Sequence, residues 1–150
     1  MAMEIPLASE IVPGLWMGGT DDLDTVNRAG RLPSASDERD FDAVVTLSAY
    51  SKPVGWYVHE FRFCIPDASL DDEHAQELEK IADWAYLQWK SGKKVLVRCQ
   101  AGMNRSGLVT ALILIRDRIK AEEAIAMIRR KRSGDALSNP SFVEYLTRQI

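Results

Sequence analysis

The chain has 150 residues, of which 46% are hydrophobic and 27% charged, and its net charge is -3 at pH 7. This length suits one core, so we expect a single domain over residues 1–150, and the negative charge argues against broad nucleic-acid binding. No apolar run approaches the roughly 18 residues of a membrane span, and MAMEIPLASE lacks a secretory-signal pattern, so we expect a cytoplasmic protein without membrane contact.

Short runs of apolar, β-prone residues predict strands, and each run is bounded by Gly, Pro, Ser or Asp. The predicted strands are Leu15–Met17, Ala43–Leu47, Trp56–Ile65 and Val95–Val97. The polar stretch Asn27–Asp40 has the composition of a loop, so we interpret it as a surface excursion.

A helix is predicted between the last two of these strands. One helical face would carry the apolar residues Leu78, Ile81, Ala82, Ala85 and Trp89. The carboxylates of residues 71–73 mark its start, because negative charge is favourable at the positive end of a helix dipole. We expect this helix to cover the sheet.

Further helices are predicted in the last third of the chain. The segment Leu108–Ile119 is apolar almost all round, as in a buried helix, and this helix starts near Arg105. Another runs from Ala121 to about Lys131, and a last one opens at Asn139-Pro140, where proline suits the first helical position. The order of elements predicts an α/β fold with a central, mostly parallel twisted sheet flanked by helices.

The stretch VLVRCQAGMNRSGL (95–108) combines a nucleophile with an anion-binding loop. A thiol reacts as the thiolate, which nearby cations and a helix N-terminus stabilise, and Cys99 lies between Arg98 and Arg105 at the end of a predicted strand. Gly102 lets the loop turn its amides towards an anion, and Arg105 can hold two phosphate oxygens. This pattern predicts a cysteine-dependent phosphatase. The alternative is an inert buried Cys99 with Arg105 capping a helix.

Residues 99–107 resemble the Cys-x-x-Gly-x-x-Arg-Ser/Thr-Gly signature of the protein tyrosine phosphatase superfamily, and in particular of the small dual-specificity phosphatases. IVPGLWMGG (11–19) is similar to the family's Pro-x-Leu-Tyr-Leu-Gly strand, and IRRKRSGDALSNPSFVEYL (128–146) to its basic helix end followed by Asn-Pro-x-Phe. The resemblance covers about residues 11–150. It implies one phosphatase domain of the dual-specificity fold that needs no metal and no cofactor.

The resemblance also implies roles for the loop residues. Cys99 would attack phosphorus to form a phosphocysteine, and Ser106 would hydrogen-bond the departing thiolate in the second step. The phosphate oxygens would be held by the arginine and the loop, that is by Gln100, Ala101, Gly102, Met103, Asn104 and Arg105. Preorganised donors of this kind stabilise developing charge.

The leaving group needs a proton that the loop cannot supply. Asp67, in CIPDASLDDEH (64–74), resembles the acid of the family's Pro-Asp loop. Asp71 and Asp72 are alternatives, although helix N-terminal carboxylates explain them better. Asp67 could also be an ordinary turn aspartate.

One position departs from the family, in which histidine usually precedes the nucleophile, because here that residue is Arg98. On a strand it would share a face with Leu96, covered by helix, and a buried guanidinium would need a carboxylate or carbonyl partner. Arg98 is then either a paired buried arginine in an active enzyme or the mark of a pseudophosphatase that binds phosphate and turns over weakly.

The loop has no lysine, which favours a phosphorylated protein or peptide as substrate over a highly charged inositol phospholipid. We expect phosphotyrosine, with phosphoserine and phosphothreonine as further candidates, and a monomer. Gly-x-Asn-Arg is also similar to the RNA 5'-triphosphatase branch of the superfamily. The basic run at residues 129–132 could guide RNA or an acidic phosphopeptide, or could satisfy a helix dipole.

Two further features each have two interpretations. The aromatic side chains of Tyr50, Trp56 and Tyr57 could line a phosphotyrosine pocket or lie in the core. Cys64 could form a reversible disulfide with Cys99 if their strands are adjacent, or act as a small buried hydrophobic residue.

Overall fold

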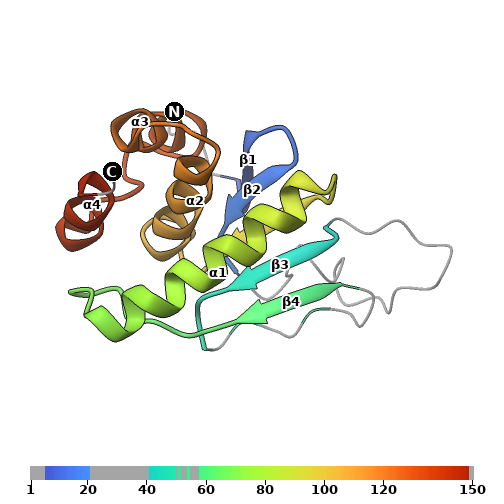
Figure 1. Ribbon diagram of the computed structural model, residues 1–150, viewed down its shortest axis with the longest axis horizontal. Helices are drawn as coiled ribbons and strands as arrows, with labels where there is room; N and C mark the ends of the chain where they lie inside the picture. The colour runs from blue at the N-terminus through green and yellow to red at the C-terminus, as the bar shows by residue number, and fades with distance from the viewer. Residues whose placement is uncertain (1–5, 21–40, 50, 52–53, 55–57, 149–150) are drawn as a thin grey trace, which may run out of the picture.

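A mixed five-stranded sheet of order β1-β2-β5-β3-β4 is the centre of the computed structural model, which describes residues 6–20, 41–49, 51, 54 and 58–148 (Figure 1). The strands are β1 (Ala8–Val12), β2 (Leu15–Gly18), β3 (Ala43–Thr46), β4 (His59–Arg62) and β5 (Val95–Arg98). Only the β1–β2 pair is antiparallel among them. The prediction of a mostly parallel sheet is confirmed. The predicted excursion Asn27–Asp40 and the side chains of Tyr50, Trp56 and Tyr57 lie outside the described residues.

Four helices begin at or close to the predicted positions, and side chains cap the first and the last of them. They are α1 (Asp72–Lys90), α2 (Arg105–Arg116), α3 (Ala121–Lys131) and α4 (Pro140–Thr147). The Asp71 carboxylate accepts a hydrogen bond from the His74 amide at 2.8 Å and caps α1. Helix α2 ends before Ile119, the predicted end, because Arg118 takes a left-handed conformation with φ of 68°.

The helices pack on one face of the sheet and enclose the main core. Val95 and Val97 of β5 point into this core, and all the side chains from residue 106 to residue 114 of α2 are buried. Burial on every side explains why α2 is apolar almost all round. The predicted face of α1 is also confirmed, because its buried residues are Leu78, Ile81, Ala82 and Ala85.

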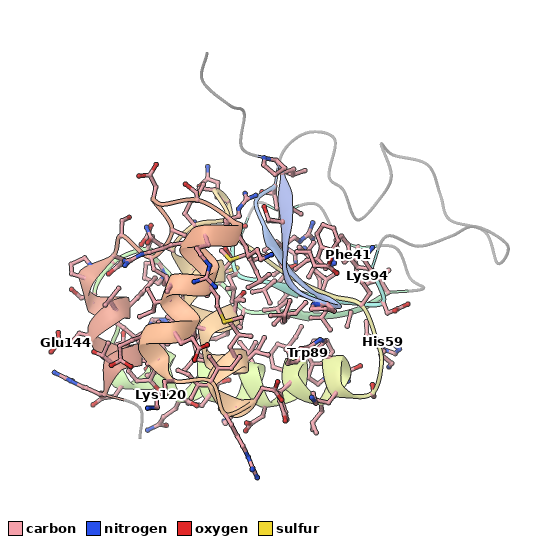
Figure 2. The ribbon with its side chains drawn as sticks, turned by 90° about the horizontal axis from the view of Figure 1, so that it is seen from above. Phe41, His59, Trp89, Lys94, Lys120 and Glu144 are labelled. Atoms are coloured by element: carbon pink, nitrogen blue, oxygen red, sulfur yellow. The ribbon has the colours of Figure 1, made fainter. Side chains whose placement is uncertain are left out.

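The opposite face of the sheet carries a smaller apolar cluster of Phe41, Val44 and Leu96, with Trp16 packed against it. In Figure 2, Phe41 and Lys94 lie on the side of the sheet away from α1 and its Trp89. The expectation that helix covers the Leu96 face is therefore wrong for the described part of the chain. The alternation of side chains along β5 places Leu96 and Arg98 on this face, away from the helices.

Strand predictions were less accurate than helix predictions. Strand β1 was not among the predicted strands, because it is a short edge strand whose ladder with β2 is interrupted between Glu10 and Val12. Strand β4 spans four residues of the predicted Trp56–Ile65.

The structure contradicts both interpretations of Cys64. Strand β3 lies between β4 and β5, so the strands that precede Cys64 and Cys99 are not adjacent. Two strand spacings amount to about 9.6 Å, which is more than the Cα separation of about 7 Å that a disulfide tolerates. Cys64 is also exposed rather than buried.

Candidate active site

Cys99 follows β5 at the carboxyl edge of the parallel strands, where ligands bind in open α/β sheets. Its side chain is only 2% exposed. The backbone amide of Gly102 donates to the Cys99 sulfur at 3.3 Å, and the hydroxyl oxygen of Ser106 lies 3.4 Å from the same atom. The sulfur thus sits beneath the loop, with donors of the kind that stabilise a thiolate.

All carbonyls of the loop from residue 100 to residue 104 have partners behind it. The carbonyls of Ala101 and Gly102 accept hydrogen bonds from Arg132 Nη2 (3.5 Å) and Nε (3.0 Å). The other three accept from backbone amides: Gln100 from Thr20 (3.1 Å), Met103 from Leu137 (3.2 Å) and Asn104 from Leu108 (2.9 Å). In a trans peptide the C=O and the next N–H point in opposite directions. The amides of residues 101–105 therefore face the inner side of the loop, as an anion cradle requires.

Glycines allow the back of the loop to touch β2. Gly102 has φ of 73°, and a Cβ there would lie 2.3 Å from the carbonyl carbon of Gly18. A Cβ on Gly19 would lie 2.8 Å from the Gln100 carbonyl oxygen. Only glycine fits this approach of two backbones. The loop contact of Gly18 and Gly19 was not predicted, although the double glycine after a strand was a visible signal.

Arg105 is the first residue of α2, and its half-buried guanidinium reaches the segment that contains Asp67. Its Nη1 atom donates to the Ile65 carbonyl at 3.0 Å. Arg105, Cys99 and Ser106 thus lie around one loop, and Arg105 links this loop to the predicted acid loop.

Two asparagines hold the exposed carboxylate of Asp67. Asn104 Nδ2 donates to Asp67 Oδ2 at 3.1 Å, and Asn139 Nδ2 donates to Asp67 Oδ1 at 2.7 Å. Asn139 also caps α4, because its Oδ1 accepts hydrogen bonds from the amides of Ser141 and Phe142. This Asn104–Asp67–Asn139 clamp joins the loop after β5, the acid loop and α4. The role of Asn139 in the clamp was not predicted.

The two alternative acids are at the start of α1. Asp71 caps the helix, and hydrogen bonds from the His74 backbone and side chain lower the pKa of its carboxyl. Asp72 is exposed in the first turn. Of the three aspartates, Asp67 is the one that contacts Asn104 of the cysteine loop.

The family model of the dual specificity phosphatase catalytic domain matches residues 26–149. The chain belongs to the dual specificity phosphatase family. It is 28% identical over 107 residues to the tyrosine phosphatase-type protein 123R of Invertebrate iridescent virus 6, over 71% of this chain and 72% of the viral protein.

Solved phosphatase structures share the fold over nearly the whole chain. Tk-PTP in its active form is 28% identical, with a TM-score of 0.73 over 97% of this chain and 99% of its own. Human DUSP28 is 23% identical, with a TM-score of 0.78 over 95% of this chain and 92% of its own. The family match and these relatives show that the chain is an enzyme of the tyrosine and dual-specificity phosphatase class.

Arg98 of this phosphatase is fully buried on the sheet face away from the helices. Its Nε donates to Thr46 Oγ1 at 3.0 Å, and its Nη2 lies 3.4 Å from Glu60 Oε2. The same carboxylate oxygen accepts from Thr46 Oγ1 at 2.6 Å and from Arg62 Nη2 at 3.1 Å. The guanidinium therefore has the carboxylate partner that its burial requires.

The four cations of the basic run at residues 129–132 have different environments. Arg132 is buried and donates to the loop carbonyls, and Arg129 donates to the carbonyls of Ala136 at 3.1 Å and Leu137 at 2.9 Å. Arg130 and Lys131 are exposed. Two of the four cations therefore serve the chain's own backbone.

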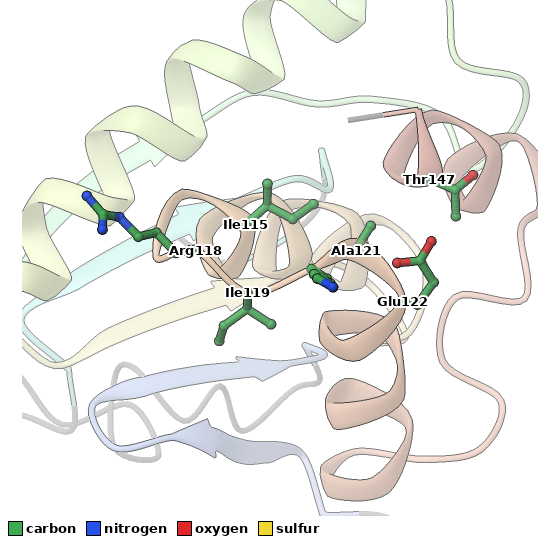
Figure 3. A pocket seen from close by; sticks show the side chains of 7 residues that line it. Ile115, Arg118, Ile119, Ala121, Glu122 and Thr147 are labelled. Carbon is green, nitrogen blue, oxygen red and sulfur yellow. The ribbon is translucent and has the colours of Figure 1, made fainter. Parts of the chain in front are cut away.

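Other possible sites lie away from Cys99 or lack the necessary groups. A cavity of about 390 Å³ is formed by the α2–α3 turn and Thr147, at the opposite end of α2 from the loop (Figure 3). In the described ranges, no three His, Cys, Asp or Glu side chains are grouped to hold a metal ion. Within the same ranges, no helix has the length and apolarity to cross a membrane.

Proposed function

We propose that this phosphatase hydrolyses phosphorylated proteins through a phosphocysteine on Cys99, acting on phosphotyrosine and also on phosphoserine and phosphothreonine. The observation that supports this most is the buried Cys99 sulfur under the inward-facing amides of a loop that leads directly into Arg105. The Asn104–Asp67–Asn139 clamp adds a carboxylic acid at the same loop.

In the first step, the Cys99 thiolate attacks phosphorus, so an S–P bond forms and the ester P–O bond breaks. Asp67 gives its proton to the leaving oxygen, which departs as the alcohol or phenol. Arg105 and the amides of residues 101–105 hold the other phosphoryl oxygens, whose charge they stabilise.

In the second step, water attacks the phosphocysteine and gives a proton to the Asp67 carboxylate. The S–P bond breaks, and the electron pair returns to sulfur. The hydroxyl of Ser106, 3.4 Å from the sulfur, donates a hydrogen bond to the departing thiolate and keeps its proton. Inorganic phosphate leaves, and Asp67 is again protonated for the next cycle.

The observations favour a phosphoprotein over RNA as substrate. Asn104 suggested an RNA 5'-triphosphatase, but its side chain contacts Asp67, Ser138 and the Asn139 amide. Arg129 and Arg132 of the basic run are bound to backbone carbonyls. The carboxylate partner of Arg98 likewise supports an active enzyme over a pseudophosphatase.

Turnover of an aryl and an alkyl phosphate by wild type, Cys99→Ser and Asp67→Asn tests the proposal, with chelator and reductant present. Cys99→Ser should be inactive on both substrates and still bind tungstate. Asp67→Asn should lose far more activity on the alkyl phosphate, whose leaving group needs the proton. Asp72→Asn is the matched control and should retain both activities. Residual turnover by Cys99→Ser, or an equal effect of both aspartate variants, would contradict the assignments.

A further inference from the structure

Arg132 lies just beyond α3 and is buried behind the cysteine loop, with 7% of its surface exposed. Its Nε donates to the Gly102 carbonyl at 3.0 Å, and its Nη2 to the Ala101 carbonyl at 3.5 Å. On the other side, Nη1 donates to Ser9 Oγ at 3.0 Å and to the Pro6 carbonyl. One guanidinium thus connects the loop to β1 and to the residue two positions before it.

Arg132 has no carboxylate partner within the described residues, in contrast to Arg116, which pairs with Glu79 and Asp83. Burial lowers the pKa of Arg132, and the charge of Cys99 acts in the opposite direction. The guanidinium of Arg132 is in turn a cation that attracts negative charge on the Cys99 sulfur. A buried cation without a carboxylate is costly, which indicates that the neighbouring loop depends on it.

The carbonyls of Ala101 and Gly102 are the two in the loop that a side chain holds. The carbonyls of Gln100, Met103 and Asn104 accept hydrogen bonds from backbone amides. If the two central carbonyls lost their partner, their peptides could rotate and turn the oxygens towards a bound anion. A carbonyl oxygen that pointed into the loop would repel phosphate. The N–H group of the same peptide would then point outward and could no longer donate to the phosphate.

We propose that Arg132 is a positioning residue of the active site, which fixes the central peptides of the anion-binding loop and stabilises the ionised Cys99 sulfur. The inference rests on the proposed role of Cys99. It assigns to Arg132 a structural task behind the loop, in place of the contact with RNA or phosphopeptide that its basic run suggested.

The test compares Arg132→Met and Arg132→Lys with Arg130→Met, a matched control that removes an exposed cation from the same basic run. The alkylating reagent is iodoacetamide, which would also react with the exposed Cys64 thiol. The wild-type reference and all variants therefore carry Cys64→Ser. The measurements are the affinity for tungstate and the pH dependence of Cys99 alkylation. Circular dichroism verifies that each variant is folded.

We expect Arg132→Met to bind tungstate about tenfold more weakly, because two peptides lose their hydrogen bonds. The midpoint of its alkylation profile should move to higher pH, because the thiolate loses a neighbouring cation. Arg132→Lys keeps the charge and loses the planar fork, so its alkylation midpoint should stay near wild type while tungstate binding weakens. Arg130→Met should match wild type in both measurements.

A folded Arg132→Met with wild-type affinity and a wild-type alkylation profile would overturn the inference. If Arg132→Met does not fold, the tungstate affinity of Arg132→Lys tests the inference instead. Wild-type affinity in Arg132→Lys would overturn it as well. Turnover enters neither measurement. A wild type that binds tungstate and hydrolyses nothing would therefore contradict the proposed function and leave the inference about Arg132 to be decided on its own results.

Discussion

Asn139 has two tasks that one substitution can separate. Its Oδ1 caps α4, and its Nδ2 donates to Asp67 Oδ1 at 2.7 Å and to the Ala68 carbonyl at 3.0 Å. Serine caps a helix about as well as asparagine, so Asn139→Ser should change the free energy of unfolding by only a few tenths of a kcal/mol through α4. Serine has no amide group with which to hold Asp67.

The expected loss in rate follows from the hydrogen bonds that disappear. A hydrogen bond to a charged group contributes about 1.5–3 kcal/mol, and we take the lower end because Asp67 is exposed and Asn104 still holds its other oxygen. About 1.4 kcal/mol corresponds to a factor of ten in rate. Asn139→Ser should therefore lower kcat for an alkyl phosphate about tenfold. Aryl phosphates with good leaving groups should be hydrolysed nearly as fast as by wild type.

A double-mutant cycle shows whether Asn139 acts through Asp67. In an Asp67→Asn background, Asn139→Ser should have almost no further effect on alkyl phosphate turnover, because the group that it positions is no longer an acid. Steady-state kinetics on both substrates and thermal unfolding of all four proteins complete the assay. An equal loss on both substrates, or a full loss in the Asp67→Asn background, would refute this reasoning.

Three further substitutions test other parts of the account. Glu60→Gln removes the carboxylate beside the fully buried Arg98, so it should lower the free energy of unfolding, measured in urea, by about 3 kcal/mol. A change below about 1 kcal/mol would contradict the importance of this ion pair. Gly102→Ala places a Cβ 2.3 Å from the β2 backbone at a residue with φ of 73°. The affinity for tungstate should therefore fall at least about tenfold. Wild-type affinity in this variant would show that the loop does not need glycine. Ser106→Ala should slow hydrolysis of the phosphocysteine about tenfold, so that a phosphoenzyme accumulates after rapid mixing with an aryl phosphate. A burst of released aryl alcohol no larger than that of wild type would count against this role.

Signals confined to a few neighbouring residues predicted the helices and the position of the loop well. Asp71 and Asn139-Pro140 marked the starts of α1 and α4, because capping depends on residues three or four positions apart. The family signature located Cys99 and the loop around it. Strand β1 escaped prediction because a short edge strand is stabilised mainly by its partner, which its own residues do not reveal.

Contacts between distant segments could not be predicted. Burial alone required a partner for Arg98, but only the strand order brings Thr46 and Glu60 to it. Arg132 reaches Gly102 and Ser9 across 30 and 123 positions of the chain. Neither interpretation of the basic run, as a guide for RNA or phosphopeptide or as cations at a helix end, includes these contacts. The same holds for Asn139, whose cap was visible while its reach to Asp67 was not.

The phosphocysteine is the central claim, and trapping it is the most direct test. Wild type and Cys99→Ser would be mixed rapidly with an aryl phosphate, quenched in acid, digested and analysed by mass spectrometry. The account predicts phosphate on Cys99 in the wild-type peptide, at a level that rises in Ser106→Ala, and none at this position in Cys99→Ser, which also lacks turnover. Full turnover by wild type with no phosphate on Cys99 at any quench time, or turnover that persists in Cys99→Ser, would contradict it.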